Sequence, residues 1–459
     1  MAGERVEQRD EDSTAEPSGI ASTGSSEPVP PPRSRRRLLS RVVVDTRPLH
    51  YPAYRRLWLS TVVTTVGSQF TVVAVPKQIY DLTGSSGYVG LTGMFGLVPL
   101  VVFGLWGGAV ADTVDRRSLL LVTNSGIALT SLLLWVQAAL GVGNVWLVLG
   151  LFAVQQAFFA VNSPARSASI ARLVPTHLLP AATALGATVF HLGAVLGPLL
   201  AGVLLPLVGL STLYLVDAIA LCAALWAVWL LPPLPPLNGA PRRAGLRDVW
   251  DGFRYLATRG VLLASFLADI IAMVAGLPRA LWPEMAERTF GDPPGGGPAL
   301  GWLYAAMPLG AFLAGLVSGW QSHVRRHGVA VVAAVCAWGL AVVGFGLSTS
   351  LAWAVVFLAL GGAADFVSMV FRGAILQTAA TDEMRGRMQG VFTVVVAGGP
   401  RLADVLHGGA AALVGTTAAA AGGGALVVVL MLAAAACLPS FLRYRAPGEK
   451  DVERATDAS

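Results

Sequence analysis

Long apolar stretches recur along nearly the whole chain, and they constrain its fold more than any other feature. Six lie between residues 57 and 231, and six more lie between residues 260 and 442. Each approaches or exceeds the roughly 20 apolar residues that an α-helix needs to cross a bilayer. The sequence therefore predicts an all-α membrane protein with twelve transmembrane helices. The expected spans are residues 57–79, 88–111, 118–140, 145–165, 181–206, 211–231, 260–282, 299–320, 329–348, 352–373, 389–413 and 422–442.

The composition agrees with a chain whose solvent is lipid. Of its 459 residues, 55% are hydrophobic and only 13% are charged, about half of the roughly 25% charged residues in a soluble domain. The metalloprotease, nucleophile-elbow and Walker motifs are absent from the sequence, so we expect neither an enzyme nor direct drive by ATP. We also expect no cofactor and no metal site, because the three cysteines lie inside apolar stretches.

The apolar stretches form two sets of six, which predicts two pseudo-symmetric six-helix bundles. A segment beginning at Arg166 follows the fourth stretch, and a weakly similar segment beginning at Arg372 follows the tenth. Such an internal repeat favours a duplicated bundle around a central cavity. The expected parts are a disordered cytoplasmic tail (1–46), an N-terminal bundle (47–231), a cytoplasmic linker (232–256), a C-terminal bundle (257–445) and a second cytoplasmic tail (446–459).

Arginines accumulate on one side of this predicted topology. The loops on that side hold thirteen of them, including Arg116, Arg117, Arg325 and Arg326, whereas the opposite loops hold essentially Lys77 and Arg288. Loops rich in Lys and Arg stay in the cytoplasm, so both termini are expected there. The net charge of +6 is then explained by loops facing an anionic leaflet rather than by a nucleic-acid partner. The expected location is a bacterial cytoplasmic membrane, with the lipid bilayer as surroundings.

A motif between the second and third stretches suggests a cytoplasmic gate. It runs from Gly108 through Asp112 and Asp115 to Arg116 and Arg117, and carboxylates beside arginines make a latch that breaks and reforms. The motif resembles the signature loop of the major facilitator superfamily, although Thr113 and Asp115 depart from the usual pattern. On this resemblance, Arg166 and Arg372 are expected to be latch partners of Asp112 and Asp115.

A second motif lies in the fifth stretch and comprises Gly193, Gly197, Pro198 and Gly202. It resembles the glycine–proline motif of the superfamily's drug:proton antiporters. Glycines four residues apart allow close helix contact, and the proline removes a backbone hydrogen bond. The motif favours export over uptake, and the alternative interpretation is an ordinary packing seam.

Several further segments are similar to the enterobactin-type siderophore exporter group within the antiporters. They begin at Asn162, Asp269, Leu303, Arg385 and Gly398, and the resemblance covers roughly residues 47–445. It implies proton-driven export of a catecholate-like siderophore, with a small molecule and protons as partners and no obligate protein partner. A multidrug or macrolide exporter is the alternative. A membrane sensor or scaffold that does not transport is a third hypothesis, from another class.

Ionisable residues inside the expected spans are costly and therefore point to function. Asp269, Asp404, Asp365 and His191 are candidates for proton coupling, although each has a plainer interpretation as a satisfied polar group between helices. Arg401 and Asp404 lie three residues apart, so they are expected to neutralise each other.

Arg279 and Arg401 are candidates for the substrate path. Iron-free catecholates are aromatic and partly acidic, and arginines and aromatic rings suit such molecules.

Overall fold

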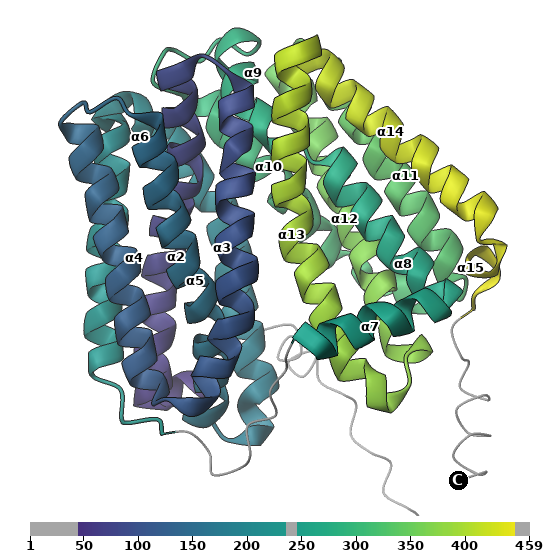
Figure 1. Cartoon of the computed structure of the whole chain (residues 1–459), viewed down its shortest axis with the longest axis horizontal. Coiled ribbons are helices and arrows are strands. Elements are labelled where there is room, and N and C mark those ends of the chain that lie inside the picture. Colours follow the sequence, from purple (N-terminus) through teal and green to yellow (C-terminus); the bar gives the residue numbers. More distant parts are fainter. Residues whose placement is uncertain (1–44, 236–245, 446–459) are drawn as a thin grey trace, which may run out of the picture. The chain divides into compact units, whose positions relative to one another are not determined.

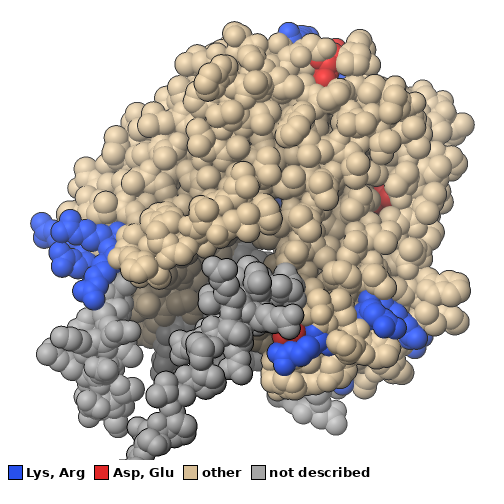
Figure 2. All heavy atoms as spheres, turned by 180° about the vertical axis from the view of Figure 1, so that it is seen from behind, with Lys and Arg blue, Asp and Glu red and all other residues tan. Residues whose placement is uncertain are grey.

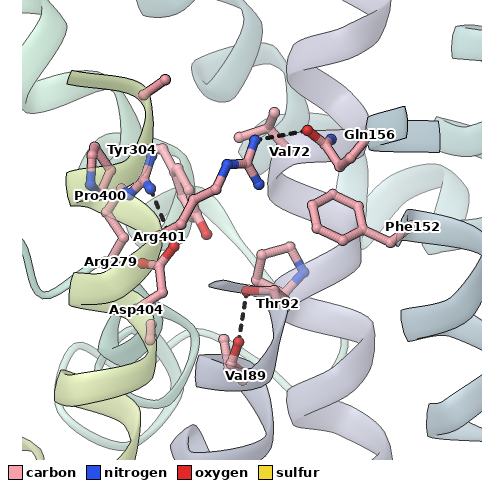
Figure 3. Close-up of a pocket in the computed structure, with 13 residues that line it drawn as sticks. Val72, Val89, Thr92, Phe152, Gln156, Arg279, Tyr304, Pro400, Arg401 and Asp404 are labelled. Atoms are coloured by element: carbon pink, nitrogen blue, oxygen red, sulfur yellow. Dashed lines mark hydrogen bonds and ion pairs between the residues drawn. The ribbon is translucent and has the colours of Figure 1, made fainter. Parts of the chain in front are cut away.

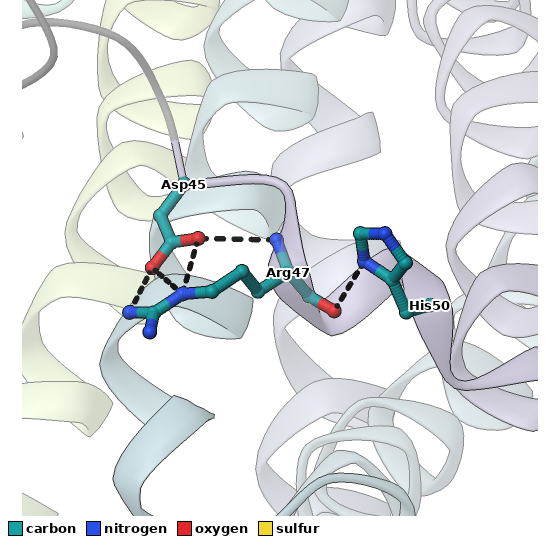
Figure 4. Close-up of polar contacts among 3 residues, drawn as sticks. All are labelled: Asp45, Arg47 and His50. Atoms are coloured by element: carbon teal, nitrogen blue, oxygen red, sulfur yellow. Dashed lines mark hydrogen bonds and ion pairs between the residues drawn. The ribbon is translucent and has the colours of Figure 1, made fainter.

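The computed structural model describes residues 45–235 and 246–445, which belong to one compact unit that begins at Asp45. The expected tails and the middle of the linker lie outside these described residues. At the start of the described chain, the Asp45 carboxylate accepts hydrogen bonds from the backbone N–H of Arg47 and from its guanidinium (Figure 4). The bond from the guanidinium lowers the pKa of Asp45.

Helices make up nearly all of the described chain (Figure 1). The N-terminal half contains η1 (Arg47–His50), α2 (Pro52–Thr83), α3 (Ser86–Thr113), α4 (Arg116–Ala139), α5 (Val145–Leu173), η2 (Thr176–Leu178) and α6 (Leu179–Trp229). The C-terminal half contains α7 (Leu246–Thr258), α8 (Gly260–Ile270), η3 (Ile271–Ala275), η4 (Arg279–Leu281), α9 (Trp282–Arg288), α10 (Pro298–Leu316), η5 (Ser318–His323), α11 (His327–Gly346), α12 (Leu351–Ala379), α13 (Asp382–Val414), α14 (Thr416–Cys437) and α15 (Pro439–Arg443).

Capping residues mark where helices end and where the next ones begin. α2 ends at Gly84, whose φ of 63° is in the left-handed region that glycine adopts without strain. Ser85 then caps α3 by accepting a hydrogen bond from the backbone N–H of Gly87. Asn144 caps α5 in the same way, with its side-chain oxygen accepting from Trp146 and Leu147.

The number of crossing segments is consistent with the twelve that were predicted. In the described chain, ten segments are long and apolar enough to cross a membrane. One of them, Thr176–Trp229, contains a break at Gly209 (φ 77°, ψ 162°) and so comprises two of the expected spans. α13 is the remaining long helix and has 33 residues.

The seventh crossing segment is discontinuous. α8 ends at Ile270, a π-helical segment (η3) follows, and the chain continues through η4 into α9. The indole N–H of Trp338 on α11 donates to the carbonyl of Ala272 at 3.0 Å, so a neighbouring helix satisfies part of the irregular backbone. Broken membrane helices are stable only where protein or water supplies such partners, and π-helical segments often mark functional sites.

Among the described residues, the two halves share a core at one end. One cluster of buried side chains contains Phe70 and Leu205 from the N-terminal half together with Trp282 and Leu300 from the C-terminal half. The other two clusters are each confined to one half. We call the end with the shared core, where α3 begins and α13 ends, the closed end.

The opposite end carries most of the described arginines, and we call it the arginine-rich end. The alternating helices bring the start of α4, the end of α5 and the start of α11 to this end. Figure 2 shows Lys and Arg gathered along the lower edge of one face, above which the surface has almost no charge. Many large apolar side chains of the described chain are exposed, among them Leu59, Val98, Leu129, Phe159, Trp226 and Trp353. Such a surface suits the hydrocarbon core of a bilayer.

Candidate functional site

A cavity of about 240 Å³ lies between the two halves, next to the closed end. Its lining comes from α2, α3 and α5 on one side and from η4, α10 and α13 on the other, so neither half forms it alone. The lining residues are Val72, Pro76, Val89, Thr92, Phe152, Gln156, Arg279, Ala280, Tyr304, Ala397, Pro400, Arg401 and Asp404 (Figure 3). Both predicted substrate-path arginines, Arg279 and Arg401, are among them.

An ion pair joins two of the charged lining residues. Arg279 Nη2 donates to Asp404 Oδ2 at 3.1 Å (Figure 3). Arg279 follows the π-helical segment and Asp404 lies on α13, so the pair connects the broken seventh span to α13. The described hydrogen bond of Asp404 is thus with Arg279, and the expectation that Arg401 also neutralises Asp404 stays a prediction. Residues three apart on a helix lie about 60° apart around its axis, so they share one side of the helix and can still reach different partners.

Arg401 instead crosses the cavity. Its Nη2 donates to Gln156 Oε1 on α5 at 2.7 Å, which is a hydrogen bond between the two halves. With two guanidinium groups and one carboxylate, the described charged groups of the cavity carry a net charge of +1 when all are ionised. Such a cavity attracts an anionic group.

A stripe of glycines on α3 lets α13 and Arg401 come this close, and the sequence analysis did not identify it. A Cβ added at Gly90 would lie 2.6 Å from the carbonyl oxygen of Asp404. One added at Gly93 would overlap the backbone of Arg401, and one added at Gly96 would overlap its guanidinium. The three-residue glycine spacing was a signal that a search for small residues at helix contacts would have found.

Aromatic side chains form part of the cavity wall. Tyr304 packs edge-on against Trp282, with ring centroids 4.7 Å apart and an interplanar angle of 86°. Trp282 is fully buried, so it fixes the orientation of Tyr304. Phe152 lies across the cavity on α5 (Figure 3). The cavity thus combines positive charge with aromatic surface.

A second charged cluster lies inside the C-terminal half and is not part of the cavity lining. Asp269 on α8 forms an ion pair with Arg372 on α12, and Arg372 Nη2 lies 3.7 Å from Asp365 Oδ1. The side chains of Asp269 and Arg372 are 3% exposed and that of Asp365 is 27% exposed. We call these three residues the acidic triad. Two of the predicted proton-coupling acids therefore share one arginine.

The described partners of Arg372 are buried acids, and its predicted gate partnership with Asp112 and Asp115 stays a prediction, because the side chain of Asp112 lies outside the described part. α12 extends to Ala379, so Arg372 lies about two helical turns inside it rather than at its end, within reach of Asp269. Arg166 occupies the matching position on α5 and donates to Thr61 Oγ1 at 2.7 Å. The two arginines are placed symmetrically, as the sequence indicated, and their described partners are buried acids for Arg372 and Thr61 for Arg166.

The described part of the gate motif forms hydrogen bonds that hold Leu234, in the linker, next to the start of α4. Asp115 caps α4 through the backbone N–H of Ser118 and also accepts from the backbone N–H of Leu234 at 2.7 Å. The backbone N–H of Arg116 donates to the carbonyl of Leu234, and Arg117 Nη2 donates to that of Trp229 at 2.6 Å. Gly108 and Asp112 lie near the end of α3, and their side-chain surroundings are outside the described part.

The glycines of the fifth span are packing positions. A Cβ at Gly193 would overlap Thr65 and one at Gly197 would overlap Gln69, so both glycines allow α6 to lie against α2. Gly202 faces the other half, where an added Cβ would lie 2.8 Å from Gly301 Cα on α10. Pro198 is buried within α6. The motif therefore packs helices within one half and, at Gly202, between halves.

The histidine candidate lies apart from both charged sites. His191 is partly exposed on α6 and packs edge-on against Phe190. His407, three residues beyond Asp404, has Nδ1 at 3.0 Å from the carbonyl of Ala403 and is buried. Neither imidazole lines the cavity or joins the acidic triad.

Asp217 is at the centre of a buried hydrogen-bond network in the N-terminal half. Its Oδ2 accepts from Thr71 Oγ1 at 2.7 Å and from Ser131 Oγ at 2.8 Å, and Gln155 Nε2 donates to Ser131. These residues tie α2, α4, α5 and α6 together. Buried polar networks of this kind stabilise helix packing in membranes.

Ion pairs and hydrogen bonds also cross between the halves at the closed end, and the sequence analysis did not foresee them. The ammonium group of Lys77 on α2 pairs with Asp81 on the same helix and donates to Glu287 Oε2 on α9 at 2.9 Å. Ser86 Oγ on α3 donates to Glu284 Oε2 on α9 at 2.5 Å. These bonds hold α9 against the N-terminal half.

Two helical halves, a cavity shared between them and charged groups buried at membrane depth define a multi-pass membrane transporter. The comparisons with known proteins agree with this class. Residues 45–452 match the family model described as transmembrane secretion effector. The chain belongs to this family of the major facilitator superfamily.

The curated relatives include exporters of one siderophore. The enterobactin exporter EntS of Shigella boydii is 32% identical over 370 residues, which cover 78% of this chain and 85% of the relative. The enterobactin exporter EntS of Escherichia coli has the same identity and coverage.

Solved structures share the fold at low sequence identity. A bacterial homologue of the human lysosomal transporter Spinster, in an inward-facing and unoccupied conformation, superposes with a TM-score of 0.67 and 15% identity, covering 88% of this chain and all of the other. The nucleoside transporter NupG superposes with a TM-score of 0.66 and 14% identity, covering 84% of this chain and 98% of NupG. These two likenesses concern the fold.

Proposed function

We propose that the protein is a proton-driven exporter of an iron-free, catecholate-type siderophore, which binds in the central cavity. The observation that carries the proposal is the positive, aromatic-walled cavity formed by Arg279, Arg401 and Tyr304. A catechol is an aromatic ring with ionisable hydroxyls, so guanidinium groups and ring faces suit it. The relatives that export enterobactin support this substrate class.

The cavity limits how much of a large substrate it holds. At about 240 Å³ it is smaller than typical ligand pockets of roughly 300–1,000 Å³. We therefore propose that it accommodates one catechol ring, positioned by Arg279 and Arg401, while the remainder of a multi-ringed siderophore lies outside it. The siderophore is not chemically modified during transport, and the proton gradient supplies the energy for its export.

We further propose that the arginine-rich end faces the cytoplasm of a bacterium. The positive-inside rule supports this orientation, since exposed Arg325 and Arg326 lie at that end. Both termini are then cytoplasmic, and the structure represents the state that is closed to the outside. A substrate made in the cytoplasm would reach the cavity in this state.

Deletion of the gene in its bacterial host tests the proposal. Under iron limitation, the mutant should secrete less siderophore than the parent, measured by mass spectrometry of the medium, and the wild-type gene should restore secretion. Unchanged secretion, together with a new sensitivity to macrolides, would favour the drug exporter instead.

Substitutions of cavity residues test whether siderophore secretion depends on the central cavity. Arg279→Gln and Arg401→Gln each remove a charge-assisted hydrogen bond worth about 1.5–3 kcal/mol, so we expect substrate affinity to fall roughly ten- to hundredfold. Arg325→Gln is the matched control, because it removes an exposed arginine outside the cavity. Equal secretion by all three variants would show that the cavity is not the substrate site.

A further inference from the structure

We infer that the acidic triad of Asp269, Asp365 and Arg372 binds the transported proton, and that the broken seventh span links it to the substrate cavity. This inference rests on the proposed function, because it concerns how export is driven. It assigns the substrate to the cavity between the two halves and the proton to a separate site inside the C-terminal half.

The first argument is the charge of the triad. Two carboxylates share one guanidinium, so the cluster has a net charge of −1 when both acids are ionised. An uncompensated charge in a buried site is strongly unfavourable, and binding one proton removes it.

The cavity has the opposite balance. Asp404 bonds to Arg279, and Arg401 lies three residues away on α13. Beside two guanidinium groups, which carry more charge than one carboxylate, Asp404 serves as the counter-ion of Arg279, and the site favours an anionic ligand over a proton. The role of Asp404 is to hold Arg279 in place until an anionic substrate takes over that guanidinium.

The geometry indicates which carboxyl group carries the proton. Asp269 contacts Arg372 directly, whereas Asp365 stands 3.7 Å from it, beyond hydrogen-bond distance. Asp365 is also the more exposed acid, so water reaches it more readily. We assign the proton to Asp365 in the described state. It leaves to water when Arg372 moves into hydrogen-bond contact with Asp365.

The helices packed against α8 carry few other described titratable or charged groups. They are His327 and Cys336 on α11, Arg401, Asp404 and His407 on α13, Cys437 on α14, and, on the short helices α7 and α15, Asp251, Arg254, Tyr255 and Arg443. In the described ion pairs, Asp269 and Asp365 are joined to Arg372 and to none of these groups.

The seventh span connects the two sites. Asp269 lies just before the π-helical segment and Arg279 lies shortly after it. The segment packs against α13, where a Cβ added at Gly399 would lie 2.8 Å from Met273 Cβ. A substrate that draws Arg279 from Asp404 therefore shifts a segment that begins next to Asp269. Movement of Asp269 alters its ion pair with Arg372 and brings Arg372 to Asp365, which then releases its proton. Substrate binding and proton binding therefore oppose each other, as antiport requires.

Proton release on substrate binding provides the test. Iron-free enterobactin is added to the purified full-length protein in weak buffer, and a pH dye reports released protons. The wild type should release protons, whereas Asp365→Asn should bind enterobactin and release none. Asp217→Asn is the matched control: it alters a buried carboxyl group of the other half and should release protons as the wild type does. Release by Asp365→Asn and Asp269→Asn equal to that of the wild type would overturn the inference.

A measurement without substrate separates this inference from the proposed function. Infrared difference spectra of the protein between two pH values report the carbonyl stretch of a protonated carboxyl group. Loss of that band in Asp365→Asn would support the proton site, even if the wild type bound no enterobactin and the proposed substrate were wrong. A band unchanged in both Asp365→Asn and Asp269→Asn would overturn the proton site whatever the substrate is.

Discussion

At the scale of single residues, Arg401 and Asp404 illustrate how packing decides partnership. Both lie on α13, and their spacing alone suggested that they pair with each other. The structure joins Asp404 to Arg279 and Arg401 to Gln156. The guanidinium of Arg401 reaches Gln156 past Gly96, where no side chain blocks it. The sequence identified the charged residues correctly, but the partner of each depends on helices distant in the chain.

Substitution of Gly96 tests this explanation. In Gly96→Ala the new methyl group would overlap the guanidinium of Arg401 and displace it from Gln156. Because a charge-assisted hydrogen bond is worth about 1.5–3 kcal/mol, we expect enterobactin to bind roughly tenfold more weakly, measured by a change in tryptophan fluorescence. Gly104→Ala on the same helix is the control, since its added Cβ meets no atom within 4 Å. Equal affinities in the two variants would contradict the role of Gly96.

At the scale of elements, the apolar stretches predicted the helices well but not their ends or interruptions. α12 continues beyond the expected residue 373 to Ala379, which places Arg372 inside the helix. The π-helical segment after Ile270 had no clear signal, because its partner Trp338 lies on another helix. Hydropathy reports how much apolar length a segment has. It does not report which neighbouring helix satisfies an irregular backbone.

The contact of α6 with α10 gives a prediction at this scale. Gly202→Val would force a side chain against Gly301, where backbone meets backbone. Overpacking of this kind costs about 1–3 kcal/mol, so we expect a lower thermal unfolding temperature and weaker transport. Gly186→Val on the same helix is the control, because nothing lies within 4 Å of its added Cβ. If both valine variants unfold at the same temperature, the contact is not a close packing position.

At the scale of the whole molecule, the two halves are held together at the closed end by a shared core and by ionic bonds. Lys77 has one acidic partner in its own half, Asp81, and one in the other half, Glu287. Transport by alternating access requires these contacts between halves to break while those within each half persist. Lys77 makes one contact of each kind, so substituting Asp81 or Glu287 tests a contact within one half or a contact between the halves.

Accessibility labelling tests the closed end. A cysteine at Val72, which lines the cavity, is introduced into a variant without Cys222, Cys336 and Cys437 and is labelled from outside with an impermeant maleimide. Glu287→Gln removes the ion pair between halves, worth about 1 kcal/mol for partly exposed groups, so labelling should become roughly fivefold faster. Asp81→Asn keeps that bond and should label at the parental rate. Equal rates in the two variants would show that Lys77–Glu287 does not hold this end closed.

The sequence by itself determined that the protein lies in a lipid bilayer, the approximate positions of its helices, its family and the identity of its buried charged residues. These depend on local quantities: apolar length, caps, and short motifs such as Gly193 to Gly202. Only the tertiary structure decided that Arg372 joins Asp269 and Asp365, that Arg279 joins Asp404, and that Lys77 crosses to the other half. The physical reason is that an ion pair forms between groups that are close in space, and distant helices bring these groups together.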